Sequence, residues 1–193
     1  MKPKVTKKYL GLLVQNSMQR VLEVLFRYPE QEFSLSDIAK EAEVAKPHTG
    51  PILANLEQLG FITIVKLSKI WRIKANQQSG NFLKSKIVYN LNFIYQCGLV
   101  EFLIEHFNNP KAIILFGSFR RGEDFSTSDI DIAIETDETE EYKTIGLRIL
   151  SDFEKEIGRK IQLHSFNRKN VDVHVFNNIA NGIVLSGFLE VKT

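Results

Sequence analysis

The sequence has little of what marks secreted, disordered or membrane proteins. It holds one cysteine, Cys97, so no internal disulfide can form, and a reducing compartment is indicated. The net charge is only +2 and 44% of the residues are hydrophobic, which argues against disorder. No charge-free window reaches the roughly eighteen apolar residues of a membrane span. The basic start, Met1–Lys8, is not followed by the apolar core of a signal peptide. We therefore expect a cytoplasmic protein without a membrane partner.

The small net charge conceals an asymmetry between the two halves. Residues 1–80 hold twelve Lys and Arg against seven Asp and Glu, a net charge of +5, while residues 81–193 hold thirteen against sixteen, a net charge of −3. A basic first half and an acidic second half suggest two modules with different partners.

The first half has the periodicity of three helices followed by a hairpin. Apolar residues recur at helical spacing, Pro47 fits a first helical turn, and Ser36 is the expected N-cap of the second helix. The expected helices are 16–28, 37–43 and 47–59, with Leu59 in the core stripe of the third, and the expected strands are 61–67 and 70–74.

The stretch FSLSDIAKEAEVAKPHTGPILANLEQLGFI, within about residues 14–76, resembles the winged helix-turn-helix family. The resemblance implies that the second helix of the pair enters the DNA major groove and that the hairpin contacts phosphates. The expected DNA contacts are Lys46, His48, Thr49, Lys66, Lys69 and Arg72. Because the helix has no arginine to read guanine, a winged helix used only for protein contacts remains the alternative. A homodimer is expected, since such modules often act on two-fold sites.

The middle of the chain is apolar and helical, and it separates two modules. Residues 81–107 favour helix, and Gly98 is expected to divide this stretch in two. The predicted organisation is a winged helix over 1–78, a helical connector over 79–96 and a second domain over 97–193.

In the second half, an apolar run ends in a glycine and a serine. Ala112–Phe116 reads as a buried strand, and Gly117 and Ser118 let the backbone turn sharply after it. If a helix begins there, its free N–H groups and the Ser118 hydroxyl can cradle a phosphate, with Arg121 nearby.

The stretch Asp129–Glu135 alternates between polar or small residues and isoleucine, as a strand does. Asp129 and Asp131 would lie on one face, with roughly 7 Å between their Cα atoms. Paired carboxylates of this kind hold hard cations such as Mg²⁺, and two such ions can activate an attacking oxygen and stabilise a leaving pyrophosphate. Ser128 is placed to orient Asp129.

The run LFGSFRRGEDFSTSDIDIAI resembles the DNA polymerase beta-like nucleotidyltransferases, most of all the minimal ones, including the antitoxin branch that pairs with HEPN proteins. The resemblance covers about residues 97–188. It implies a mixed sheet, a triphosphate held by Gly117, Ser118, Arg121 and Ser128, and Mg²⁺ (or Mn²⁺) held by Asp129 and Asp131. It also implies an NTP substrate, with ATP as first choice, transfer of its nucleoside monophosphate to a hydroxyl, and a HEPN-type partner.

One expected residue of that family is missing. A helix over 140–157 should lead to a strand over 159–166, where the family places a third carboxylate, and this chain has Gln162 there. His164 lies two residues on, so it would share the face and could serve as the base, or else be a surface or supporting residue.

The sequence thus predicts an α+β protein, with a winged helix-turn-helix, a helical connector and a polymerase beta-like domain. The predicted function is Mg²⁺-dependent nucleotidyl transfer coupled to DNA binding. The alternative is a transcription regulator or antitoxin-like protein whose second domain binds nucleotide or a partner without turnover.

Overall fold

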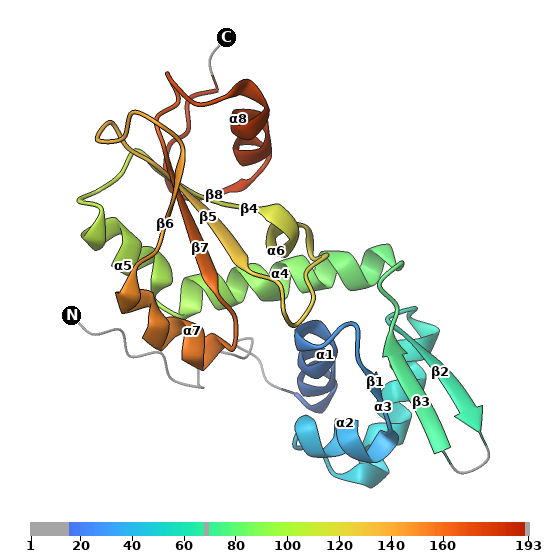
Figure 1. The fold of residues 1–193 in the computed structure, drawn as a ribbon. Coiled ribbons are helices and arrows are strands. Elements are labelled where there is room, and N and C mark those ends of the chain that lie inside the picture. Colours follow the sequence, from blue (N-terminus) through green and yellow to red (C-terminus); the bar gives the residue numbers. More distant parts are fainter. Residues whose placement is uncertain (1–15, 68–69, 192–193) are drawn as a thin grey trace. The chain divides into compact units, whose positions relative to one another are not determined.

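The computed structural model describes residues 16–67 and 70–191 of the chain, which splits into two compact units (Figure 1). The division lies between Phe93 and Ile94, inside helix α4 (Gly80–Gln96). The first unit holds the described residues up to Phe93, and the second unit holds those from Ile94 onward. The architecture is mixed α+β, as the sequence predicts.

The first unit has the element order of a winged helix, and its sheet has the strand order β1-β3-β2. Val21 and Leu25 of the first helix, Ile38 of the second, Leu53 of the third and Ile73 of the hairpin are fully buried in one core. Before α4 the elements are α1 (Ser17–Arg27), β1 (Glu32–Phe33), α2 (Leu35–Glu41), α3 (Lys46–Gln58), β2 (Ile62–Leu67) and β3 (Ile70–Ala75).

Two local predictions for this unit are wrong. Helix α2 begins two residues earlier than expected, because Ser34 and not Ser36 is its N-cap. The Ser34 hydroxyl accepts from the Asp37 N–H, and the Asp37 carboxylate accepts from the Ser34 N–H, each at 3.2 Å. Leu59, expected in the core, is 48% exposed, because α3 ends at Gln58 and Leu59 is its C-cap.

The second unit is built on a mixed sheet with the strand order β6-β7-β5-β4-β8. Strands β5 and β7 are parallel, and β4 runs antiparallel to both β5 and β8. The elements are α5 (Leu99–His106), β4 (Ala112–Phe116), α6 (Gly117–Arg121), β5 (Ile130–Glu135), β6 (Lys143–Ile145), the 3₁₀ helix η2 (Arg148–Leu150), α7 (Ser151–Ile157), β7 (Ile161–Phe166), α8 (Val173–Ala180) and β8 (Ile183–Gly187).

Both faces of this sheet are covered. Ile114, Ala133 and Phe166 pack with Ile179 of α8 in one core cluster. The residues that alternate with them along the strands, such as Leu115, are also fully buried. The functional chemistry is therefore confined to the ends of the strands.

The expected division at Gly98 is confirmed, because Gly98 has a φ of +75° between α4 and α5. The expected long helix over 140–157 is wrong. Thr144 and Ile145 are β-branched and form β6 at the sheet edge, and Gly146 follows before α7 begins at Ser151. Within the described ranges, no single helix is long and apolar enough to cross a membrane, although the bent pair α4 and α5 passes by length and composition.

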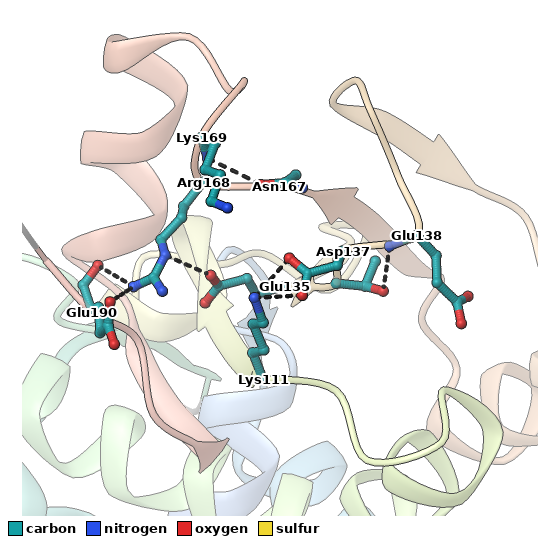
Figure 2. A network of polar contacts seen from close by, with 9 residues as sticks. Lys111, Glu135, Asp137, Glu138, Asn167, Arg168, Lys169 and Glu190 are labelled. Atoms are coloured by element: carbon teal, nitrogen blue, oxygen red, sulfur yellow. Dashed lines mark hydrogen bonds and ion pairs between the residues drawn. The ribbon is translucent and has the colours of Figure 1, made fainter.

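The end of the sheet where β5 stops is closed by charged side chains (Figure 2). Glu135 is 2% exposed, and its Oε1 lies 3.3 Å from Nε of Arg168, which also pairs with Glu190 at 2.5 Å. Lys111 pairs with Asp137 at 2.6 Å. Burial raises the pKa of Glu135 from its ordinary value, against the opposing charge of Arg168.

Candidate functional site

The Gly117 turn lies directly against the Asp131 carboxylate. Gly117 follows β4 with a φ of +74°, and Phe116 pairs with Asp131 across the sheet. A Cβ at position 117 would stand 3.1 Å from Cγ of Asp131 and closer still to Oδ2. Only glycine fits here, both in backbone conformation and in space.

The other predicted phosphate-binding residues have different surroundings. Ser118 is half-buried in the first turn of α6. Arg121 is exposed, and its Nε lies 2.6 Å from Oε2 of Glu123. The Ser128 hydroxyl accepts from the N–H of Phe125 at 2.9 Å and so closes the loop before β5.

Asp129 and Asp131 lie at the start of β5, with Gln162 beside them. Strand β5 begins at Ile130, so Asp129 immediately precedes it. Asp131 pairs with Gln162 in the parallel ladder, and Nε2 of Gln162 donates to Oδ2 of Asp129. The residue at the predicted third-carboxylate position therefore orients one of the two acids.

His164 is buried next to Asp131, with only 7% of its surface exposed. Its ring stacks on Tyr142 at 5.5 Å and meets the edge of Phe116 at 5.1 Å. Its Nδ1 lies 2.6 Å from the Tyr142 hydroxyl, and its Nε2 lies 3.5 Å from Oδ1 of Asp131. A hydroxyl that donates to Nδ1 leaves the ring proton on Nε2, facing Asp131. The 3.5 Å separation is longer than an ordinary hydrogen bond, and Nε2 has no hydrogen-bond partner among the described residues.

Tyr142 was missed by the sequence reasoning, because it falls in the stretch assigned to a helix. Burial raises its pKa, and so does the negative charge of Asp131.

The loop that leads to Asp129 is held by an arginine that the sequence reasoning also missed. Arg159, which precedes β7, pairs with the fully buried Asp124 at 3.0 Å, and its side chain is 9% exposed. It also donates to the carbonyl oxygens of Phe125 and Ser128. No sequence motif links two such residues across 35 positions, so only the fold brings them together.

The donor set fits Mg²⁺ bound jointly with a substrate. Two carboxylates lie at one strand end, and Mg²⁺ commonly takes one or two carboxylates and completes its octahedron with phosphates and water. Among the described residues, no group of three His, Cys, Asp or Glu side chains could hold a metal by itself.

The predicted DNA-binding residues of the first unit divide into two groups. Lys46 and His48 are exposed at the start of α3. Thr49 was expected to face outward, but it is fully buried, and its hydroxyl donates to the carbonyl oxygen of Ala45 at 3.2 Å. A residue four positions after the N-cap has turned back onto the core face.

On the hairpin, Lys66 lies 4.6 Å from the centre of the Trp71 ring. Arg72 is held by Glu32 through two hydrogen bonds of 2.5 and 2.9 Å, so its charge is partly neutralised. Lys69 lies outside the described residues.

In comparisons with known proteins, a family model matches most of the second unit. Residues 99–187 match the family model "Polymerase beta, Nucleotidyltransferase". No curated protein matches the chain.

Several solved structures match the chain at low similarity. A transcription regulator of the Staphylococcus aureus multidrug efflux pump MepA is 19% identical with a TM-score of 0.37, over 49% of this chain and 66% of that one. The transcriptional regulator PA4135 is 18% identical with a TM-score of 0.35, over 49% and 75%. The heme sensor protein PefR from Streptococcus agalactiae is 16% identical with a TM-score of 0.34, over 51% and 67%. The chain thus spans about two thirds of the first of these structures.

The element order of residues 16–75, the Gly117 turn against Asp131 and the family match agree with one another. Residues 99–187 thus match the polymerase beta nucleotidyltransferase family model, and they follow a unit with the element order of a winged helix-turn-helix.

Proposed function

We propose that this chain is a Mg²⁺-dependent nucleotidyltransferase, which moves a nucleoside monophosphate from an NTP to an acceptor hydroxyl. The observation that carries the proposal is the contact of the Gly117 turn with the Asp131 carboxylate, two residues after Asp129, in a stretch that matches this family model. ATP is the first NTP to test, and Mn²⁺ is the alternative ion.

Each residue of the site has a part in this proposal. Asp129 and Asp131 hold the ion, which when bound neutralises charge on the triphosphate. The backbone of Gly117 and the hydroxyl of Ser118 bind phosphate oxygens. Gln162 orients Asp129. His164 packs beside Asp131 and does not take the acceptor proton, because its ring is enclosed by Phe116 and Tyr142.

The first experiment is calorimetric titration of each NTP with Mg²⁺ into the wild type and the isosteric variants Asp129→Asn and Asp131→Asn. We expect each variant to bind at least tenfold more weakly, equivalent to about 1.4 kcal/mol. The matched control is Asp137→Asn, an exposed carboxylate at the opposite end of the sheet, which should bind as the wild type does. No Mg²⁺-dependent binding of any NTP by the wild type would refute the proposal.

Turnover is then measured without knowledge of the acceptor. Water can replace the acceptor hydroxyl, so a working site should release pyrophosphate slowly from the bound NTP, and Asp131→Asn should abolish this release.

A second candidate is a domain that binds nucleotide or a partner without turnover, in a transcription regulator or an antitoxin-like protein that neutralises a HEPN-type partner. The presence of Gln162 at the third-carboxylate position favours this candidate. A neutral amide is a poor base, and the Gln162 amide donates a hydrogen bond to Oδ2 of Asp129, an oxygen that would otherwise be open to a metal ion. Mg²⁺-dependent NTP binding without pyrophosphate release would support this candidate over transfer.

We propose further that the winged helix binds duplex DNA through the start of α3 and the hairpin, as a homodimer. The exposed Lys46, His48 and Lys66 support this assignment. Each phosphate contact that is lost should reduce the slope of log affinity against log salt by about 0.9. Lys46→Ala should lose about one such contact, and sedimentation of the protein with a palindromic duplex would report the number of copies bound. An unchanged salt slope in Lys46→Ala would remove α3 from the interface.

A further inference from the structure

A pocket of about 490 Å³ opens beside Asp129, on the side away from the Gly117 turn. It is lined by Ser126 and Thr127, by the acidic residues Asp129 and Glu154, and by the cationic residues Lys155, Arg159 and Lys160. All of these residues lie in the second unit.

The strand order sets where this pocket lies relative to the other parts of the site. In the order β7-β5-β4, the Gly117 turn follows β4 on one side of β5, while Lys160 immediately precedes β7 on the other. Asp129 and Asp131, at the start of β5, therefore stand between the turn and the pocket. In phosphoryl-type transfer, the attacking and leaving oxygens lie roughly in line on opposite sides of the phosphorus. With the triphosphate on the Gly117 side, the pocket is where an acceptor would approach.

The polar groups of the pocket differ in what they already bind. Arg159 is occupied by Asp124 and by two carbonyl oxygens of the loop. Glu154 accepts from the N–H of Ile161 at 2.9 Å. Glu154 and Arg159 therefore act as structural residues in the lining of the pocket.

Lys155 and Lys160 are exposed at the pocket, and no carboxylate among the described side chains pairs with either. Lysine is a compact, hydrated point charge that binds phosphate through several donor directions. Asp129 and Glu154 also line the pocket, but Glu154 already accepts from the Ile161 N–H, so Lys155 and Lys160 are the charges available to an anionic ligand.

We propose that this pocket holds the acceptor, and that the acceptor carries a phosphate group bound by Lys155 and Lys160, with its hydroxyl directed to Asp129. The inference rests on the proposed function. The hydroxyl oxygen forms a bond to the α-phosphorus, the bond from that phosphorus to the β-phosphate oxygen breaks, pyrophosphate leaves, and the hydroxyl proton passes to water.

The test uses glycerol 3-phosphate, a phosphate monoester that carries hydroxyls, with glycerol as the uncharged probe. Both are titrated into the full ¹⁵N-labelled chain with and without Mg²⁺ and ATP. We expect saturable amide shifts at Ser126, Thr127 and Lys160 with glycerol 3-phosphate and none with glycerol. Glycerol 3-phosphate should bind equally well when ATP and Mg²⁺ are present.

Charge variants make the assignment specific. Lys155→Gln and Lys160→Gln should each raise the Kd for glycerol 3-phosphate about threefold to fivefold, the range expected for one exposed charge pair, and leave ATP binding unchanged. The matched control Lys143→Gln removes an exposed lysine from β6 and should change neither Kd.

Several results would overturn the inference. One is an absence of saturable shifts at the pocket. Another is displacement of glycerol 3-phosphate by ATP with shifts at Gly117 and Ser118, since the probe would then report the triphosphate site. A third is an equal Kd in wild type and in both lysine variants. If the pocket binds glycerol 3-phosphate but no NTP binds with Mg²⁺, the proposed function fails, and the acceptor role fails with it.

Discussion

Gly117→Ala tests the close approach on which the candidate site depends. The substitution places a residue with a Cβ at φ +74°, which costs about 1–2 kcal/mol by itself. The new Cβ would also stand 3.1 Å from Cγ of Asp131, so the carboxylate must leave its present rotamer, at about 0.5–1.5 kcal/mol. We expect a total loss of about 2–3 kcal/mol in the free energy of unfolding, measured by urea denaturation followed by circular dichroism.

The chain offers a matched control in Gly98, which has nearly the same φ of +75° but has nothing within 4 Å of an added Cβ. Gly98→Ala should therefore show the backbone cost alone. In an Asp131→Ala background, Gly117→Ala should fall to the same cost, leaving a coupling energy of about 1 kcal/mol between positions 117 and 131. A coupling energy near zero, or equal effects of the two glycine substitutions in the wild type, would refute the steric argument. Because the carboxylate moves, Gly117→Ala should also weaken Mg²⁺-dependent ATP binding at least tenfold.

Three further predictions concern other parts of the chain. Glu32→Gln should strengthen duplex DNA binding and steepen its salt dependence, because it frees the charges of Arg72 and Lys74 from their ion pairs with Glu32. Unchanged binding would show that β1 and β3 do not contact the DNA. Burial raises the pKa of Glu135, so its contribution to stability is present below its ordinary pKa of 4.5 and is lost as the pH rises through the folded value. As the pH rises above 4.5, the wild type should lose free energy of unfolding relative to Glu135→Gln, measured by urea denaturation. Parallel pH profiles of the two proteins would contradict a raised pKa of Glu135. Arg159→Met should cost about 3–5 kcal/mol by leaving the Asp124 carboxylate buried without its charged partner, whereas a loss below about 1 kcal/mol would show that water reaches Asp124.

The elements that sequence reasoning located correctly have strong local signals. The apolar run Ala112–Phe116 and the alternation after Asp129 became β4 and β5, and the periodic helices of the first half were found to within a few residues. Helix ends were less certain, because Ser34 and Ser36 are both good N-caps, and only the Ser34–Asp37 capping box decides between them.

The site could be predicted only where its residues are close in sequence. Gly117, Asp129 and Asp131 fall in one motif, and antiparallel pairing of β4 with β5 brings Asp131 beside the Gly117 turn. Tyr142 and Asp124 carry no local signal, because each acts through a residue more than twenty positions away, His164 and Arg159 respectively. The prediction that Thr49 faces outward was wrong for a related reason, since its position on the core face depends on where α3 begins.

We expect Gln162 to limit how many ions the proposed site can hold, and Gln162→Glu tests this directly. Its amide now donates to Asp129, so the site offers two carboxylates, which suffice for an ion shared with a triphosphate but leave a second ion, about 4 Å away, short of ligands. A glutamate at this position supplies the missing carboxylate beside Asp129. Without metal, the two like charges should lower the melting temperature. With Mg²⁺ the loss should be reversed, and the apparent Mg²⁺ affinity should rise at least tenfold. Gln162→Leu, which removes the amide without adding charge, should show no such Mg²⁺-dependent gain. Equal responses of the two variants to Mg²⁺ would mean that position 162 does not face the ion, and Gln162 would then no longer argue against turnover.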